Sequence, residues 1–548
     1  AAGKVQVVSK EHSVERQVDV DGLPWNVYDA AAIEAYYRQN PLKLAQRVAD
    51  LTKCLGYAAS SIAVNAMRGQ RGTSLIDSSA KALANALAQA GPTYSKFGQA
   101  LSCRPDLVGE GVAAALQELQ DRVPAFDHHN ARRIVEEELG GAGKELLDTM
   151  GDETVAAATL GQVYRANVGN KPVALKVQRP GVMQGVAADS LLVRSAASAL
   201  EQLKNPLSGE RLLKPALVQG CDEFFSRLFE ESDYEREAAN LAKFAAIYGG
   251  VEGRDGSSRI IVPNLYEELS TKRVITMEWV EGRRLSEHAV VDAQDLPTLR
   301  LGIECSLSQC LETGVMHADP HGGNLLKTED GLAYLDFGMV SEVPEQVREG
   351  LLRAVAYTVA GEYGKVAELF GDLMLIPQEI LDDPAQLQEL TEALSETADA
   401  ILERPDPAAG ASSVPTLRFD RLIGAIAAFA PRFQFQLPPY FLNNARAIGT
   451  LEGLAKTADP SFNLLSEVYS FAISQLLTSP SPGMRKTLKD LTYDPSTGRP
   501  DLKRVKRLVR EASIISGKRK RRIVWDTAKT RGGRGFAAKA LRDAIASR

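Results

Sequence analysis

The sequence lacks several features that would assign it to a large class of proteins at once. Its five cysteines among 548 residues form no Cys-x-x-Cys pair, which argues against a zinc site or a disulfide framework and favours a reducing compartment. No stretch approaches the roughly 18 consecutive apolar residues of a transmembrane helix, so none is expected. The chain begins Ala1-Ala2-Gly3 without methionine; loss of a targeting segment and simple removal of methionine explain this equally well.

What is present is the composition of a globular protein of several domains, with an uneven distribution of charge. Hydrophobic residues make up 44% and charged residues 24% of the chain, which is ordinary for a folded protein. The net charge is −6, but residues 503–548 hold 16 lysines and arginines against three acids, so a basic tail follows an acidic body. Such a tail suits an anionic partner: acidic lipid, nucleic acid, or the acidic body itself.

An N-terminal extension is predicted over residues 1–90. Residues 1–40 are polar and without clear period, whereas apolar residues recur at helical spacing over 41–62 and again over 78–90. We favour packing of the helix at 41–62 against the rest of the chain. The alternative is an amphipathic helix that touches a lipid surface.

A helical element is predicted over 91–150, with helices at 109–121 and 128–139 and an N-cap at Asp127. Residues 151–282 then read as the smaller lobe of a kinase-like fold, because strands, a long helical region and further strands follow one another. These segments are 154–166, 172–178, 186–240, 259–262 and 272–279.

The remainder is predicted to be mainly helical. A larger lobe covers 283–475, with breaks at its prolines, and it includes a helix over 297–316 that ends at Gly314. Residues 484–515 continue helically within a C-terminal region, 476–548, that ends in a basic segment.

The most informative stretch is His317–Gly338, which holds Asp319, Asn324 and Asp336. The pattern Asp-x4-Asn followed by Asp-Phe-Gly is the arrangement with which a kinase lobe holds magnesium and nucleotide. Asp336 would bind a metal ion that bridges the phosphates and Asn324 a second one, whereas Asp319 would accept the proton of a nucleophile. A lone Asp-Phe-Gly is common by chance, but one preceded by Asp-x4-Asn at this distance is not.

Two further pieces precede this stretch in the order that a nucleotide site requires. Lys176, in Val-Ala-Leu-Lys on a predicted strand, would contact the α and β phosphates, and its carboxylate partner is expected within 230–238. Residues 277–280 would form a hinge whose backbone, at Glu278 and Val280, meets an adenine ring. A lone Val-Ala-Leu-Lys is usually an ordinary buried strand; its place in this series favours the nucleotide site.

Three features of an ordinary protein kinase are missing. The phosphate loop should read Gly-x-Gly-x-x-Gly, but the turn here is Ala156-Ala157-Ala158-Thr159, followed by Gly161. Alanine restricts φ, so this turn should be stiffer. No Ala-Pro-Glu follows the Asp-Phe-Gly, and no arginine precedes Asp319. A kinase that phosphorylates peptides is therefore the least favoured interpretation.

These motifs resemble the UbiB/aarF-domain family of atypical kinases over about residues 91–475. The resemblance is carried by Lys-x-Gly-Gln at Lys96–Gln99, the alanine turn, Glu-x-Asp at Glu231–Asp233, and Asp-Pro-His-x-Gly-Asn with Asp-Phe-Gly. Segments Asp21–Pro24 and Tyr36–Arg47 resemble the plastid branch. The resemblance implies an α+β fold, an atypical protein-kinase-like two-lobed fold with an N-terminal helical extension and added C-terminal helices.

The resemblance also implies roles for individual residues. Lys176 would pair with Glu237 in the catalytic set, to which Asp319 and Lys96 also belong. Lys96 would contact Glu231 and Asp233 where a protein substrate would otherwise enter, because a lysine beside two carboxylates neutralises them. Those two acids and Gln99 would be regulatory.

Two residues depart from the family pattern. Gly322 stands where the pattern has proline, so the catalytic loop should be more flexible at that turn. Thr159 stands where it has serine, which keeps a hydroxyl. Neither change removes a charged group, so binding of ATP and Mg²⁺ is expected.

The resemblance implies an ATP- and Mg²⁺-dependent kinase or ATPase that supports prenylquinone or other isoprenoid-lipid metabolism. The expected partners are nucleotide, a membrane or lipid-droplet surface and a prenylquinone or phenolic lipid, with no nucleic acid. The expected location is the chloroplast, at plastoglobules or thylakoids, with the mitochondrion as the alternative. A second interpretation is a non-catalytic, nucleotide-gated lipid-binding or scaffold protein, favoured by the obstructed substrate entrance and the basic tail.

Overall fold

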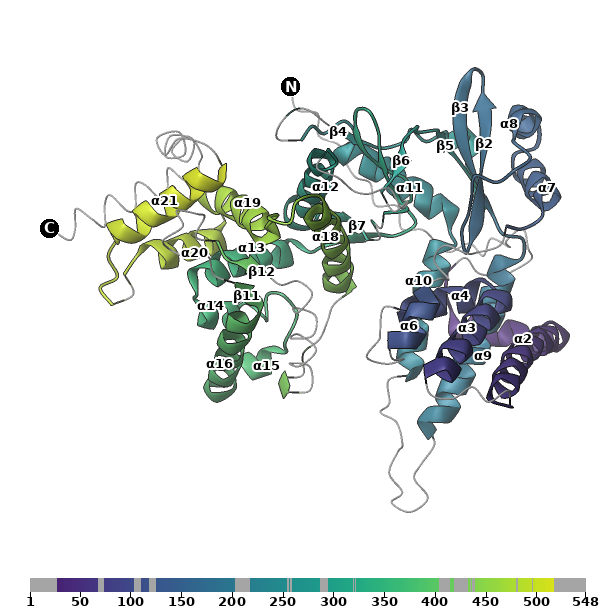
Figure 1. Ribbon diagram of the computed structural model, residues 1–548, viewed down its shortest axis with the longest axis horizontal. Coiled ribbons are helices and arrows are strands. Elements are labelled where there is room, and N and C mark those ends of the chain that lie inside the picture. Colours follow the sequence, from purple (N-terminus) through teal and green to yellow (C-terminus); the bar gives the residue numbers. More distant parts are fainter. Residues whose placement is uncertain are drawn as a thin grey trace, which may run out of the picture. The chain divides into compact units, whose positions relative to one another are not determined.

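Two structural units share the chain (Figure 1). The first consists of the described residues up to Ala242 together with Pro263–Trp279, and the second of Lys243–Val262 together with those from Val280 onward. In this computed structural model the described residues are 27–67, 73–102, 110–117, 125–202, 217–253, 256, 259–285, 294–318, 320, 322–403, 414–417, 432–433, 435, 439–479, 481–494 and 496–516.

In the first unit, helix α9 (Val182–Gln202) is the centre of a group of helices. It contacts α1 (Ala30–Gln39), α2 (Pro41–Met67), α4 (Pro92–Ser102) and α10 (Leu217–Glu231). The helix predicted from residue 41 is confirmed, and its side-chain contacts place it against the rest of the first unit. The remaining helices of this group are α3 (Thr73–Ala90) and α6 (Glu110–Gln117), which pack on each other and on α4.

Helix α1 lies where the sequence analysis expects irregular chain, and that expectation is wrong. Asp29 caps the helix, because its Oδ1 accepts the backbone N–H groups of Ala31 and Ala32 at 3.0 Å each. Ile33 and Tyr37, one turn apart, are buried with residues of α9 and α10. Two buried residues are too few to show a helical period. The sequence signal for this helix is instead an aspartate, which caps it, followed by three alanines.

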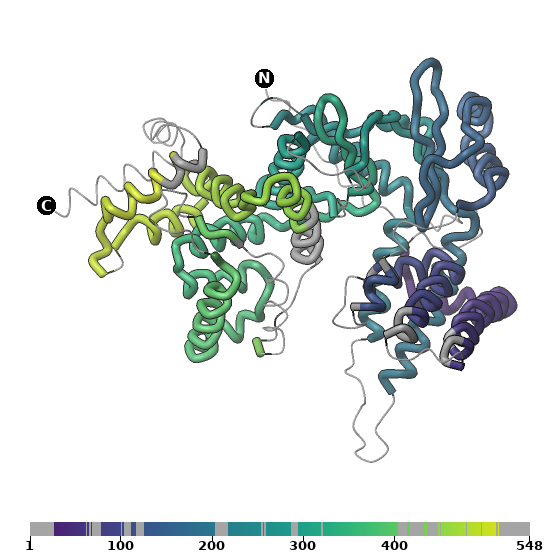
Figure 2. The backbone as a smooth tube through the Cα atoms, in the orientation of Figure 1, coloured from purple at the N-terminus to yellow at the C-terminus, as the bar shows by residue number. Residues whose placement is uncertain are grey.

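An antiparallel sheet of order β1-β2-β3-β5 forms the other part of the first unit. Its long central hairpin, blue in Figure 2, confirms the strands predicted at 154–166 and 172–178. Helices α7 (His128–Leu139) and α8 (Lys144–Thr149) cover one face and share an apolar core with the strands. The predicted cap of α7 is confirmed, since Asp127 Oδ1 accepts the His129 N–H at 2.7 Å. The strands are β1 (Ala156–Ala157), β2 (Gly161–Val168), β3 (Lys171–Gln178) and β5 (Val274–Glu278).

Strand β4 (Arg259–Ile261) corrects the sequence analysis, which places it in the smaller lobe. It pairs in parallel with β9 (Gly331–Tyr334) in the sheet of the second unit, of order β4-β9-β8-β6. Gly331 makes this pairing possible, because its φ is +151° and a Cβ there would meet the Arg259 backbone N at 2.6 Å. The residue types of this strand, Arg-Ile-Ile, do not indicate which sheet it joins. The other strands are β8 (Leu325–Lys327) and β6 (Arg283–Arg284).

The helix predicted over 297–316 is confirmed as α12 (Leu296–Ser308) followed by one π-helical turn, η3 (Gln309–Thr313). The helical run ends at Gly314, whose φ of +75° stops it. The chain then enters β7 (Val315–His317), which pairs with β10 (Val340–Glu342). The helix–glycine–strand order therefore delivers His317 to the start of the motif stretch.

The rest of the second unit is mainly helical, as predicted. The expected continuous helix over 484–515 is wrong, because the chain turns between α20 (Pro482–Thr492) and α21 (Leu502–Ser516), where Gly498 has a φ of +64°. Across the described residues no helix is long and apolar enough to cross a bilayer. The remaining helices are α13 (Glu345–Ala360), α14 (Tyr363–Glu368), α15 (Gln378–Leu381), α16 (Pro384–Ile401), α18 (Pro439–Ala458) and α19 (Leu464–Thr478).

Candidate functional site

Lys176 and Glu237 form a buried ion pair in the first unit. The Lys176 Nζ lies 2.6 Å from Glu237 Oε1 and 2.8 Å from Oε2, and the two side chains are 13% and 2% exposed. Strand β3 presents the lysine and helix α11 (Tyr234–Tyr248) presents the glutamate from its first turn. Lys176 Nζ also lies 5.1 Å from the centre of the Tyr234 ring. The lysine is thus held at a fixed place with its charge retained.

Lys96 and Gln99, both on α4, reach other candidate residues of the first unit. Lys96 Nζ lies 2.6 Å from Glu231 Oε2, with side chains 26% and 15% exposed. Gln99 Nε2 donates a hydrogen bond of 3.3 Å to Thr159 Oγ1. Residues 96 and 99 are one helical turn apart, so they lie on the same side of α4. This helix therefore connects the Glu-x-Asp motif with the alanine turn.

Asp233 has a structural role that the sequence analysis did not assign. Its Oδ1 accepts the backbone N–H groups of Glu235 and Arg236, at 3.1 and 3.2 Å, so it caps the N-terminus of α11. Four residues farther along that helix stands Glu237. Asp233 therefore also helps to hold the partner of Lys176 in place.

The alanine turn is shorter than predicted, because Ala156 and Ala157 form strand β1 and pair with β2. Ala158 and Thr159 lie in the turn itself, which is held by its backbone groups. The Ala158 N–H donates to the Gly161 carbonyl at 2.8 Å, and Arg179 donates from Nε to the Thr159 carbonyl at 3.1 Å and from Nη2 to the Ala158 carbonyl at 3.3 Å. Burial lowers the pKa of the Arg179 guanidinium. Sequence reasoning missed Arg179; the available signal was an arginine one residue beyond β3, at the end where the turn lies.

Close packing requires a glycine at residue 161. A Cβ at this residue would lie 2.6 Å from the Val177 carbonyl oxygen of the neighbouring strand. In the hinge predicted at 277–280, the Glu278 N–H donates to the Asn264 carbonyl at 2.8 Å. The boundary between the two units falls in the hinge, between Trp279 and Val280.

In the second unit, the β8–β9 hairpin brings Asn324 and Asp336 to the same end. Leu325 pairs with Tyr334, and the Leu335 N–H donates to the Asn324 carbonyl at 3.1 Å. The twelve-residue spacing thus becomes spatial proximity. Asp336 Oδ1 accepts the Gly338 N–H at 2.9 Å, which orients the carboxylate.

His317 is a second residue whose role the sequence analysis left unassigned. The residue is 1% exposed, and its Nε2 forms a hydrogen bond with the main-chain carbonyl of Asp336. The rings of Phe244, Tyr334 and Phe337 surround it, with centroids 5.4 to 6.1 Å away. The histidine therefore anchors the backbone at the metal-ligand candidate. Its position as the first residue of the His317–Gly338 stretch was the sequence signal for this role.

Asn324 and Asp336 fit a magnesium ion by their chemistry. Mg²⁺ prefers oxygen ligands and is usually held by one or two protein groups together with phosphate oxygens and water. A carboxylate and a carboxamide at one end of a hairpin supply such groups. Asp319 lies outside the described residues, so its role as a base stays a prediction.

Similar proteins place these observations in a family. Residues 118–370 match the ABC1 atypical kinase-like domain. The chain is 34% identical, over 86% of its length, to an uncharacterized aarF domain-containing chloroplastic protein kinase of Arabidopsis thaliana, of which it spans 64%. It is 36% identical to an uncharacterized protein of Synechocystis, over 89% of the chain and 69% of that protein. A solved complex of Rv3197 with erythromycin from Mycobacterium tuberculosis is 24% identical, with a TM-score of 0.43, over 66% of this chain and 87% of that one.

A chloroplastic Arabidopsis relative bears the name Activity of BC1 Complex Kinase 1; it is 31% identical over 89% of this chain and 69% of its own length. The matched domain contains Lys176, Glu237 and both metal-ligand candidates. The family resemblance and the kinase-like α+β fold are therefore confirmed. This chain belongs to the ABC1/aarF family of atypical kinase-like proteins.

Proposed function

We propose that this protein is an atypical kinase or ATPase that binds ATP and Mg²⁺. The ion pair of Lys176 with Glu237 carries the proposal, because a buried lysine held by a carboxylate is the group that contacts the α and β phosphates in kinases. Asn324 and Asp336 supply the oxygen ligands that such a reaction needs. Bound Mg²⁺ would neutralise charge on the phosphates; the chain's own part is to hold the lysine and the two ligands.

The substrate class that we propose is prenylquinone or another isoprenoid lipid, at a plastid membrane or lipid body such as a plastoglobule or thylakoid. Several Arabidopsis relatives bear chloroplastic names, and the basic tail suits an acidic lipid surface. The Lys96–Glu231 ion pair supports a small or lipid-linked substrate. The family resemblance implies that these residues lie where a protein substrate would otherwise enter.

Magnesium-dependent nucleotide binding by an Asp336→Asn variant tests the proposal. The substitution removes a charged metal ligand and keeps the shape of the side chain, so the affinity for ATP with Mg²⁺ should fall at least about tenfold. Asp330→Asn is the matched control, since Asp330 is on the same hairpin but forms an exposed ion pair with Arg259; its affinity should be unchanged. Equal affinity of the wild type and Asp336→Asn would refute the assignment.

The second candidate is a non-catalytic, nucleotide-gated lipid-binding or scaffold protein, which the short Lys96–Glu231 ion pair favours. Single-turnover release of phosphate from ATP distinguishes the two functions, measured with and without anionic liposomes and a prenylquinone precursor. Turnover by the wild type supports the enzyme. Nucleotide binding without turnover, in both the wild type and Lys96→Ala, supports the scaffold.

A further inference from the structure

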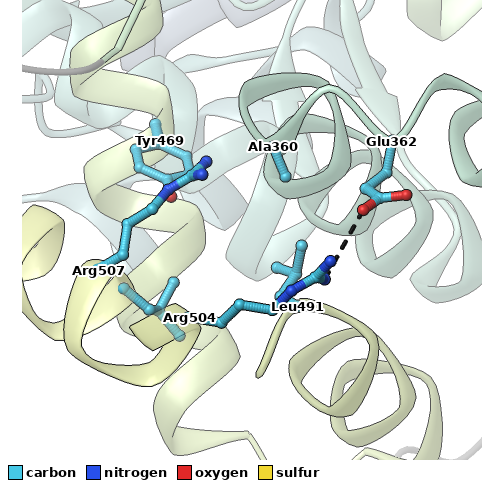
Figure 3. A pocket seen from close by; sticks show the side chains of 7 residues that line it. Ala360, Glu362, Tyr469, Leu491, Arg504 and Arg507 are labelled. Atoms are coloured by element: carbon cyan, nitrogen blue, oxygen red, sulfur yellow. Dashed lines mark ion pairs between the residues drawn. The ribbon is translucent and has the colours of Figure 1, made fainter. Parts of the chain in front are cut away.

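A pocket in the second unit lies apart from every residue assigned above. It is formed where α21 packs near the end of α13 and against α19 and α20, and its volume is about 140 Å³. Figure 3 shows Arg504 and Arg507 of α21 directed toward it, with Glu362 at one edge and Tyr469 at the other. Ala360 and two leucines supply its apolar lining.

The two arginines are placed on one side of their helix by sequence spacing. Residues three apart in a helix lie one above the other, and α21 carries Arg504 and Arg507 at that spacing. Leu508 is 6% exposed and fixes this side of the helix against the body of the unit. Both arginines therefore line one small cavity, Arg504 partly buried and Arg507 exposed.

The ion pairs that Arg504 makes within the chain are long. Its Nη1 lies 3.9 Å from Glu362 Oε1 and its Nε 3.9 Å from Asp501 Oδ2, while Nη1 reaches the Asp490 carbonyl at 3.5 Å. Strong charge-assisted hydrogen bonds are about 2.7–2.9 Å long. An entering anion would thus replace weak contacts, with Glu362 as its competitor for Arg504.

The charge around the pocket favours an anion and its size limits which one. Helices α20 and α21 together hold eight lysines and arginines against two acids, so they attract negative charge. A cavity of about 150 Å³ holds one benzene-sized molecule, whereas drug-sized ligands need roughly 300–1,000 Å³. The pocket therefore has room for one charged group, and the rest of a larger ligand would lie outside it.

We propose that this pocket binds a single phosphate-type anion between Arg504 and Arg507. Arginine is favoured for this task because its planar group donates two parallel hydrogen bonds to phosphate oxygens. The Tyr469 hydroxyl and the apolar lining complete the site. The anion is either free inorganic phosphate or the phosphate of a lipid headgroup, and the two share the same recognition chemistry.

Titration calorimetry on the full chain tests the proposal, with inorganic phosphate, a soluble short-chain phosphatidic acid and phosphatidic-acid vesicles as separate probes. The pocket variant is Arg504→Gln with Arg507→Gln. The matched control is Lys503→Gln with Lys506→Gln, which removes the same charge from positions of the same helix that do not line the pocket. The wild type and the control should bind at least one probe saturably, and the pocket variant should bind it at least about tenfold more weakly.

A third variant, Ala360→Leu, narrows the cavity without changing any charge, and it should weaken binding as well. Melting temperatures establish that each variant is folded. Equal loss in the pocket variant and the control would overturn the proposal, because the attraction would then be diffuse. Unchanged binding by Ala360→Leu, or no saturable binding by the wild type, would overturn it too. Binding of inorganic phosphate identifies the free anion as a ligand, and binding of the lipid probes alone identifies a headgroup.

Discussion

At the scale of single residues, the candidate site depends on charges that the fold has removed from water. Glu237 is 2% exposed and Lys176 13%, so each needs the other as its counter-ion. A buried ion pair contributes little net stability, but removing one partner is strongly destabilising because a charge is left unpaired. The same pair can therefore be tested for its structural role and its functional role separately.

We expect Lys176→Met to lower the free energy of unfolding by about 3–5 kcal/mol, because it leaves Glu237 charged and buried. The double variant Lys176→Met with Glu237→Gln should regain most of that stability, since no unpaired charge remains. Neither should bind nucleotide, because the lysine that we propose to contact the phosphates is absent in both. Equilibrium urea unfolding and ATP titration measure the two properties. If Lys176→Met alone were as stable as the wild type, the buried carboxylate of Glu237 would not depend on this lysine.

Two buried thiols give a pH prediction. Burial raises the pKa of Cys305 to about 11 and that of Cys310 to about 12, from an ordinary 9.0. At pH 8 only about one Cys305 in a thousand is a thiolate, so both residues should resist iodoacetamide in the native protein while the half-exposed Cys54 reacts. Peptide mass spectrometry measures this; native labelling of Cys305 as fast as Cys54 would contradict it.

The raised pKa values of Cys305 and Cys310 also make the stability of the fold fall as the pH rises. Between pH 9 and each raised pKa the unfolded chain loses the thiol proton and the folded chain keeps it. The contribution of these thiols to stability is therefore complete below pH 9 and is lost as the pH rises through 11 to 12.

At the scale of elements, one ion pair attaches α2 to α9. Arg47 donates from Nε to Asp189 Oδ1 and from Nη2 to Oδ2, both at 2.7 Å, and from Nη2 to the Ala90 carbonyl at 2.6 Å. The Asp189 side chain is 1% exposed, and burial raises its pKa although Arg47 opposes the shift. This contact supports the interpretation that α2 packs on its own protein. The same helix also carries exposed apolar residues, among them Leu55, which is 53% exposed.

Arg47→Leu should lower the free energy of unfolding by about 3–5 kcal/mol, because Asp189 remains buried without its partner. Lys53→Leu is the control on the same helix: its ion pair with Asp50 is exposed and 3.8 Å long, so its effect should be about 0–1 kcal/mol. Chemical denaturation followed by circular dichroism measures both. Equal effects would show that the Arg47–Asp189 contact contributes nothing beyond a surface pair.

At the scale of the whole molecule, the division of charge between body and tail predicts how the protein meets a membrane. Residues Lys518–Arg522 are five consecutive basic residues; they lie outside the described residues. Near an acidic lipid surface each contributes roughly 1 kcal/mol, and salt screens that attraction. Flotation with anionic liposomes should therefore weaken steeply as salt rises, and replacing the five by glutamine should reduce the salt dependence. Flotation that salt does not change would instead indicate an apolar anchor on α2, whose Leu42 and Tyr57 are exposed.

Elements were predicted well from the sequence where their signal lies within a few neighbouring residues, and poorly where it depends on a distant part of the chain. Helix α7 and its Asp127 cap were predicted to the residue because a cap and a helical period lie within a few residues of each other. Strand β3 was equally clear, since alternation is a local pattern. Helix α1 was missed, because its few buried residues do not show a period. Strand β4 was predicted but assigned to the wrong sheet, because its partner lies more than 70 residues away.

By itself, the sequence determined the chemistry of the candidate site. The spacing of Asn324 and Asp336, the lysine on β3 and the alanine turn are all local patterns of residue type. Only the tertiary structure decided the contacts that no motif names: that Asp233 caps α11, that Arg179 holds the turn and that His317 anchors Asp336. The pocket beside Arg504 likewise comes from four helices packed together. The physical reason is that hydrogen bonds and burial join residues far apart in the chain, and no local pattern records which distant residue will be the partner.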